Sequence, residues 1–187
     1  ARPPRPNTFA GLSLVLDRVA GHRDEAAWIA SHARSASARY LLLDSRGDAF
    51  LQQHADALRW LDAGERERWF ADAPSCLLGI AHGAPHFLLV ADDVARIGEL
   101  EFALGARRMS LRGAGLLLGA DEAGLFAYAK GLAHWQRETR FCAYCGAALQ
   151  LVSAGHRAQC TNPGCARLQF PRTDAAVIML VEHEGAC

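Results

Sequence analysis

The pattern of hydrophobic and polar positions over residues 1–138 is that of a mixed α/β domain. A short apolar run at 39–44 ends in the polar turn 45–48, after which residues 49–53 can return as a second strand. The same arrangement recurs over 76–91, where two apolar runs flank a turn that contains glycine and proline. These two segments predict two β-hairpins.

Two other stretches have the spacing of helices. Residues 23–33 are rich in alanine around a tryptophan and an isoleucine, which favours a helix. Asp121 can cap a second helix that runs from Glu122 to about Arg137. The positions that follow its helical repeat are Leu125, Tyr128, Ala129, Leu132 and Gln136.

The next segment, 139–172, is rich in cysteine. Four of the 6 cysteines in the chain lie between residues 142 and 165, in two pairs that each stand in a turn-forming context. In a reducing compartment, two such pairs indicate a tetrahedral zinc site more than disulfides or a redox dithiol. Four thiolates leave no coordination position for a water molecule, so we expect a structural zinc ion. The expected ligands are Cys142, Cys145, Cys160 and Cys165.

A small hairpin is predicted between the cysteine pairs, with strands at 149–152 and 157–159 around Gly155. The segment is then a zinc ribbon of about 35 residues, which is too short to fold by burial of apolar surface alone. The metal is expected to supply most of its folding free energy. His156 could replace a cysteine as ligand, but because both pairs are complete we expect it on the hairpin surface.

A third segment begins at Thr173. The run 175–181 is apolar throughout, as in strands that are buried on both faces of an α/β sheet. Two interpretations are open. Either this strand pairs with the first segment, or it opens a further domain that is cut off after its first strand.

Composition and charge narrow the class of protein. The chain is 51% hydrophobic and 21% charged, which is typical of a globular protein and excludes disorder of the whole chain. Because it has neither an apolar run long enough for a membrane span nor a secretory signal, we expect a cytoplasmic protein without membrane contacts. The 20 basic and 20 acidic residues cancel. Residues 134–173, however, hold five arginines against one glutamate, net +4, and 174–187 are net −3.

Three motifs follow one another in the second half of the chain. They are Phe-Cys-Ala-Tyr-Cys-Gly at 141–146, Cys-Thr-Asn-Pro-Gly-Cys at 160–165 and Phe-Pro-Arg-Thr-Asp-Ala-Ala-Val-Ile-Met-Leu at 170–180. This order resembles the zinc-binding NADH pyrophosphatases of the Nudix hydrolase superfamily. Zinc ribbons are common, but a ribbon followed directly by an aromatic-Pro-Arg strand is typical of that branch.

The resemblance implies an α+β chain in three parts: an N-terminal Nudix-like domain at 1–138, the zinc ribbon at 139–172 and the first strand of a truncated catalytic Nudix domain at 173–187. It implies a parent enzyme that cleaves the pyrophosphate of NADH, and usually NAD⁺, to AMP and nicotinamide mononucleotide with Mg²⁺ or Mn²⁺. Some members also remove NAD caps from RNA, and members form homodimers.

One departure from the family concerns the Nudix box, whose glutamates bind the divalent ions. In this order of domains the box would lie downstream of residue 187, and the charged run at 65–68 lacks its spacing. Metal-assisted phosphoryl chemistry needs several carboxylates that converge on the ion. We therefore expect the 187-residue chain alone to lack pyrophosphatase activity.

The resemblance also implies residues that contact substrate. The family's aromatic-Pro-Arg motif lies against the substrate pocket, so Phe170 would stack near a base and Arg172 would offset phosphate charge or bind Asp174. Alternatively, Phe170 belongs to the ribbon core and Arg172 forms an ion pair that only stabilises the fold. Arg112 resembles an arginine that family members place near the substrate, and a solvated surface arginine is the alternative.

A different class of function remains open from the same residues. Trp135, Phe141 and Tyr144 lie beside Arg137 and Arg140, as in sites for single-stranded nucleic acid. In a ribbon the same rings can pack around the metal or form a dimer interface. The alternative to a piece of an enzyme is thus a self-contained zinc-ribbon module that binds nucleic acid or a protein.

Overall fold

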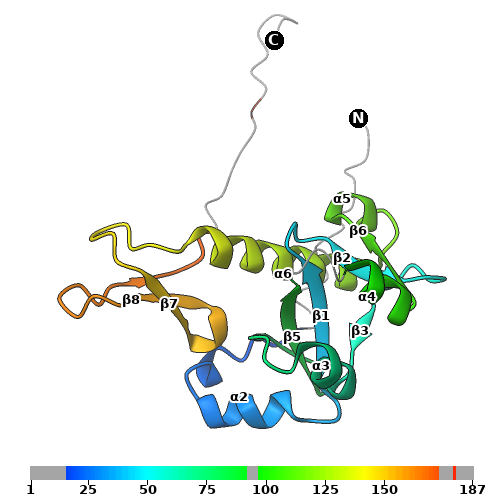
Figure 1. Cartoon of the computed structure of the whole chain (residues 1–187), viewed down its shortest axis with the longest axis horizontal. Helices are drawn as coiled ribbons and strands as arrows, with labels where there is room; N and C mark the ends of the chain where they lie inside the picture. The colour runs from blue at the N-terminus through cyan, green and yellow to red at the C-terminus, as the bar shows by residue number, and fades with distance from the viewer. Residues whose placement is uncertain (1–15, 92–96, 173–178, 180–187) are drawn as a thin grey trace, which may run out of the picture.

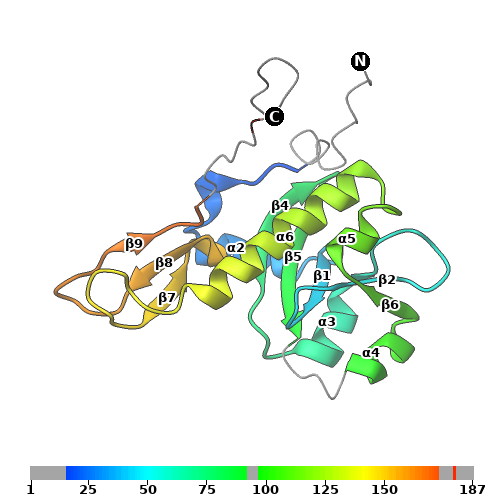
Figure 2. The ribbon, with the colours of Figure 1, turned by 90° about the horizontal axis from the view of Figure 1, so that it is seen from above.

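A computed structural model describes residues 16–91, 97–172 and 179 of the chain (Figure 1). These residues form a six-stranded sheet with its helices and a separate three-stranded sheet. The smaller sheet lies at one end of the molecule, and helix α6 (Ala120–Glu138) runs from the larger sheet toward it (Figures 1 and 2). The α+β class expected from the sequence is confirmed. The strand predicted at 175–181 falls outside the described residues except for Met179.

The larger sheet contains both predicted hairpins. Its strand order is β4-β5-β1-β2-β6, and β3 pairs with β1. β1 and β5 run parallel, and the other pairs are antiparallel. The strands are β1 (Arg39–Asp44), β2 (Ala49–Gln52), β3 (Trp60–Leu61), β4 (Cys76–Ala81), β5 (Ala84–Ala91) and β6 (Ala106–Met109).

Both predicted helices are present, as α2 and α6. The described helices are η1 (Ala20–His22), α2 (Ala26–Ala33), α3 (Ala63–Phe70), α4 (Ile97–Ala103), α5 (Leu111–Ala114) and α6. The expectation that Asp121 caps α6 is wrong, because the helix begins earlier and its N-cap is Gly119, which makes no side-chain cap. Asp121 lies instead in the first turn, where its charge favours the helix dipole. None of these helices has both the length and the apolar character that crossing a membrane requires.

Strand β1 is buried on both faces, which makes the sheet the middle of three layers. Leu41 and Leu43 pack in a cluster that includes Phe126 of α6. Tyr40 and Leu42 point the other way, into a cluster that contacts α2, α3 and α4. The four side chains are at most 1% exposed, and the two-residue alternation of a strand assigns them to the two faces.

The smaller sheet is the predicted ribbon hairpin with one added strand. It consists of β7 (Leu149–Val152), β8 (Arg157–Cys160) and β9 (Leu168–Gln169), which pair antiparallel in that order. The short 3-10 turn η3 (Ser153–Gly155) joins β7 to β8. Two-residue strands such as β9 have too few positions for a periodic signal, so the sequence did not predict it.

The charged run at 65–68 has a structural role in α3. Glu65 and Asp62 each accept a hydrogen bond from the other's backbone N–H, at 3.1 and 2.8 Å, in a capping box. Glu65 also forms an ion pair with Arg59. These contacts account for the carboxylate of Glu65 without a metal ion.

Candidate functional site

Two tight turns place the cysteines at one end of the ribbon. In the first turn the N–H of Cys142 donates to the carbonyl of Ala147 at 2.8 Å, and the N–H of Gly146 donates back to the carbonyl of Cys142 at 2.9 Å. Gly146 has φ 72°, a conformation that favours glycine. In the second turn the N–H of Cys165 donates to the carbonyl of Asn162 at 2.9 Å. The backbone therefore folds back at both pairs.

The four cysteine sulfurs form a compact cluster. They all lie within 4.8 Å of one another, with Cys142 and Cys165 at 3.8 Å and Cys145 and Cys160 at 3.4 Å. Four thiolates around zinc, with Zn–S bonds of about 2.3 Å, have sulfur-to-sulfur distances of about 3.8 Å. A disulfide needs about 2.0 Å. The donor set and its spacing fit one Zn²⁺ ion and do not fit disulfides.

The pKa values of two of the clustered thiols are shifted in opposite directions. Hydrogen bonds from the N–H groups of Tyr144 and Cys145 lower the pKa of the Cys142 thiol to about 6. Burial, followed by the neighbouring thiols, raises the pKa of Cys160 to about 12. A bound dication stabilises the thiolate form of both groups, because metal binding and loss of the thiol proton are linked.

The turn η3 fixes the ribbon to the larger sheet. Nε2 of His156, a residue that is 8% exposed, donates to the carbonyl of Leu77 in β4 at 2.6 Å. The buried thiol of Cys76 donates to the carbonyl of Ala154 at 2.8 Å. The expectation that His156 lies on the hairpin surface is therefore wrong, because packing against β4 buries its ring and supplies its partner. Burial lowers the pKa of His156 to about 4, so the ring is neutral at pH 7.

A polar cluster ties the same turn to the segment that precedes α2. The side chains of Ser153 and Arg157 both donate to the carboxylate of Asp24. These hydrogen bonds lower the pKa of Asp24. On the other side of the turn, Nε2 of Gln136 in α6 donates to the carbonyl of Gly155 at 2.8 Å. The ribbon is thus held by three separate parts of the N-terminal domain.

A groove of about 630 Å³ lies between α6, the ribbon and the residues on either side of η1, here called the N-terminal segment, which contribute Arg18 and Arg23. Tyr128 and Trp135 line it from α6, and Phe170 and Arg172 line it where the described chain leaves the ribbon. Phe170 is 53% exposed, so its ring is not part of a ribbon core. The structure therefore brings two of the three predicted substrate residues together at one groove.

Arg112 lies elsewhere. It is an exposed residue of α5, and Figure 1 shows α5 at the end of the molecule away from the ribbon. It is absent from the described residues that line the groove. The third predicted substrate residue is thus separated from Phe170 and Arg172 in this chain.

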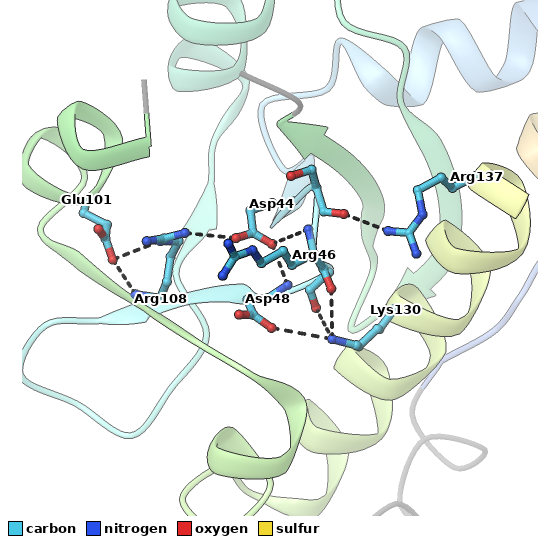
Figure 3. A network of polar contacts seen from close by, with 9 residues as sticks. Asp44, Arg46, Asp48, Glu101, Arg108, Lys130 and Arg137 are labelled. Atoms are coloured by element: carbon cyan, nitrogen blue, oxygen red, sulfur yellow. Dashed lines mark hydrogen bonds and ion pairs between the residues drawn. The ribbon is translucent and has the colours of Figure 1, made fainter. Parts of the chain in front are cut away.

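A polar network on another side of α6 holds the β1–β2 turn (Figure 3). Nη1 of Arg108 donates to the buried carboxylate of Asp44 at 3.0 Å. Lys130 and Arg137 of α6 donate to carbonyls of the turn at 2.8 and 2.7 Å. These donors are engaged within the fold, so the network positions the turn and leaves little capacity for a ligand.

Sequence patterns did not indicate the two groove residues of the N-terminal segment, Arg18 and Arg23. Their position depends on Asp17, which pairs with Ile80 at the edge of β4 through two backbone hydrogen bonds of 2.9 and 2.7 Å. This pairing brings the guanidinium of Arg18 over the ring of Tyr128, 4.5 Å from its centroid. Single-sequence patterns do not reveal an isolated bridge between distant segments.

Two family models match the chain in succession. The NADH pyrophosphatase-like rudimentary NUDIX domain matches residues 37–135, which is more than half of the chain. The NADH pyrophosphatase zinc ribbon domain matches residues 137–170 and contains all four clustered cysteines.

Three relatives are similar over parts of the chain. It is 33% identical over 119 residues to the NAD-capped RNA hydrolase NudC of Mycobacterium tuberculosis, which covers 62% of this chain and 36% of that protein. It is 34% identical over 74 residues to the human NAD-capped RNA hydrolase NUDT12, or 36% and 16% of the two chains. It is 38% identical over 61 residues to the chloroplastic Nudix hydrolase 19 of Arabidopsis thaliana, a match that covers 33% of this chain and 14% of that protein. The chain thus spans between 14% and 36% of the length of these relatives. By the two family matches, the chain belongs to the zinc-ribbon NADH pyrophosphatases of the Nudix hydrolase superfamily.

Proposed function

We propose that this chain is the N-terminal and zinc-ribbon part of an enzyme that hydrolyses the pyrophosphate bond of NADH and NAD⁺ to nicotinamide mononucleotide and AMP. The observation that carries the proposal is the four-cysteine cluster followed on the same ribbon by Phe170 and Arg172, which line one groove. Relatives named as NAD-capped RNA hydrolases support an NAD-type substrate and extend it to RNA caps.

In this proposal the chain has three parts, at 1–138, 139–172 and 173–187. The ribbon holds Zn²⁺ and sets the orientation of the N-terminal domain toward a catalytic Nudix domain that begins at Thr173. Catalysis would depend on Mg²⁺ or Mn²⁺ held by a Nudix box, and the 187 residues do not include one. The chain alone is therefore proposed to be inactive. The proposed zinc ligands are Cys142, Cys145, Cys160 and Cys165.

The proposal assigns substrate contacts to the exposed ring of Phe170, which would stack on a ring of the dinucleotide, and to the Arg172 guanidinium, which would offset phosphate charge. Arg112 is left outside the site because of its distant position on α5. Exposed Phe141 and Tyr144 support a homodimer, since exposed apolar surface often marks an interface. Thiolate ligands stay reduced in the cytoplasm, which supports that location.

The test uses the protein expressed from its native gene. Its intact mass is compared with the 20.2 kDa of this chain, and hydrolysis of NADH is measured as AMP released with Mg²⁺. We expect a larger protein that hydrolyses NADH, and a 187-residue chain that does not. A native protein without hydrolysis would contradict the function, and hydrolysis by the 187-residue chain would contradict its inactivity.

The substrate contacts are tested in the same assay. Phe170→Ala and Arg172→Ala are each expected to raise KM for NADH by about tenfold, the loss of one good stacking or charge-assisted contact. Phe102→Ala and Arg46→Ala are matched controls, since both residues are exposed and lie outside the groove. Equal KM values for all four variants and the native protein would remove Phe170 and Arg172 from the site.

One observation favours a second function, the binding of single-stranded nucleic acid. The guanidinium of Arg167 lies 3.9 Å from the centroid of the exposed Tyr144 ring, so a cation and a stacking surface stand together on the ribbon. This function predicts binding of an RNA oligonucleotide whose affinity falls steeply as salt rises. Absence of binding at low salt would exclude it.

A further inference from the structure

The groove beside α6 contains buried polar atoms that no described residue satisfies. Nη2 of Arg23 and the hydroxyl of Tyr128 are both buried and lie near each other, but neither makes a hydrogen bond of normal geometry to a described residue. Both residues line the groove of about 630 Å³. Because buried polar groups in native proteins nearly always have partners, this pair indicates that the groove receives a ligand.

The charge of the groove specifies what kind of ligand would fit. Nε of Arg23 donates to the carbonyl of Arg18 at 3.1 Å, which holds the two arginines together on one wall. Burial raises the pKa of Tyr128 although both arginine charges oppose the rise, so its hydroxyl is protonated and can donate. No acidic residue occurs among the described residues that line the groove. The wall therefore presents donors and positive charge to an anion.

These arginines differ from the other cations around α6. Lys130 and Arg137 donate to carbonyls of the β1–β2 turn, and Arg108 pairs with Asp44 (Figure 3). Arg18 and Arg23 form no ion pair with any residue in the described part of the chain. No described acidic side chain neutralises these two arginines, whereas the charge of the other three is already used in the fold.

The rest of the groove suits a planar ring. Trp135 and Phe170 supply aromatic surface along its length. Helix α6 also contributes Gly131 to the groove lining, and an added Cβ there would meet no atom within 4 Å, so the space at that position is open. Aromatic faces next to paired guanidinium groups are the chemistry that recognises a base with its phosphate.

We propose that this groove binds a nucleoside phosphate, with the phosphate on Arg18, Arg23 and the Tyr128 hydroxyl and the planar ring against Trp135 or Phe170. The inference rests on the proposed function, because a dinucleotide pyrophosphatase acts on ligands made of such halves. It adds residues from the N-terminal segment and α6 to the site, apart from the aromatic-Pro-Arg motif.

The test is a titration of the zinc-loaded 187-residue chain with AMP, in which binding is measured by calorimetry and by tryptophan fluorescence. We expect AMP to bind saturably and inorganic phosphate to compete with it. Arg23→Gln should weaken AMP binding by about tenfold or more, since it removes a charge-assisted contact. Tyr128→Phe removes only the hydroxyl and should weaken it by about threefold to tenfold.

Arg46→Gln is the matched control, because Arg46 is exposed and lies outside the groove. It should leave AMP affinity unchanged. Equal weakening by Arg23→Gln and Arg46→Gln would overturn the proposal, since only the net charge would then matter. Thermal unfolding of each variant shows whether it is folded, and Tyr128→Phe keeps the test decisive if Arg23→Gln does not fold.

A second arm distinguishes the two sources of the same chemistry. A short RNA with a 5′-phosphate is titrated beside AMP: tighter binding of AMP identifies a free nucleotide, and tighter binding of the RNA identifies an RNA end. If neither ligand binds saturably at millimolar concentration, the proposal is overturned.

The groove and the function can fail separately. AMP binding without NADH hydrolysis by the native protein would contradict the function alone. Hydrolysis with AMP binding and KM unchanged in Arg23→Gln would contradict the groove alone.

Discussion

The imidazole Nε2 of His156 in the ribbon donates to the backbone carbonyl of Leu77 in the larger sheet, across 2.6 Å. This bond lies at the turn η3, where the ribbon meets β4. The bond needs a proton on Nε2, which the neutral Nε2 tautomer and the imidazolium both carry. Burial decides between these two forms, because it lowers the pKa of His156 to about 4 although the Leu77 carbonyl favours the charged ring.

Stability should therefore fall as the pH is lowered from 6.5 toward 4. The pKa of His156 is about 4 in the folded chain and 6.5 for an ordinary histidine, so the unfolded chain binds the proton first. The contribution of the neutral ring is complete above pH 6.5 and is lost through this window, by up to about 3 kcal/mol. Urea unfolding of the zinc-loaded chain at several pH values measures the loss.

His156→Gln is the variant that isolates this effect, since it keeps a donor but does not titrate. Its free energy of unfolding should depend less steeply on pH between 6.5 and 4 than that of the wild type. His54→Gln, at an exposed position, should keep the wild-type dependence. Protonation of the cysteines affects all three chains alike. The same slope for His156→Gln and the wild type would contradict the assignment.

Gly155→Ala should destabilise the contact between ribbon and sheet. Gly155 has φ +88°, and an added Cβ would lie 2.7 Å from both Cys76 Sγ and Gln136 Nε2. Strain and overlap together should cost about 2 kcal/mol or more in the free energy of unfolding. Gly98→Ala is the control, because its Cβ meets nothing within 4 Å and it lies in α4, so it should be neutral or stabilising by up to about 1 kcal/mol. Equal effects of the two variants in a denaturant titration would refute the packing argument.

The neighbouring arginines Arg107 and Arg108 should differ sharply on substitution by alanine. Arg108 pairs with Asp44, whose side chain is 1% exposed, whereas Arg107 pairs with Asp56, whose side chain is 57% exposed. Arg108→Ala leaves a buried carboxylate without its cation and should cost about 3 kcal/mol. Arg107→Ala breaks an exposed pair and should cost less than about 1 kcal/mol. Similar unfolding midpoints for both variants would show that the burial of Asp44 does not matter.

Removal of zinc should unfold the ribbon and leave most of the larger sheet intact. Atomic emission is expected to find one zinc ion per chain, and a chelator should increase hydrogen exchange and protease cleavage across 139–172 while β1 and β5 stay protected. Cys145→Ser should abolish stoichiometric zinc, and Cys187→Ser should retain it. A ribbon that keeps its protease resistance after the metal is removed would contradict a structural zinc site.

The sequence predicted the strands and the cysteine cluster, which depend on patterns among residues close together in the chain. The apolar run at 39–44 and its return at 49–53 became β1 and β2, and the cysteine spacing predicted a cluster that the structure brings together. What it missed depends on tertiary contacts. His156 was expected at the surface because nothing near it in the sequence reveals β4, and the groove depends on Asp17 pairing with a strand more than sixty residues away. Periodicity assigns faces to elements, but it does not say which distant element covers them.

The ribbon is attached at one end and holds its cysteines at the other. Val152 and Arg157 pair beside the anchored turn, and Leu149 and Cys160 pair at the far end of the same hairpin, next to the cluster. The chain then returns along β9 to Phe170 at the groove. A metal ion at the cluster would therefore restrain the end of the ribbon that lies far from its attachment to the larger sheet. Loss of zinc is then expected to loosen the strand that leads back to Phe170, so the metal would influence the groove without lining it.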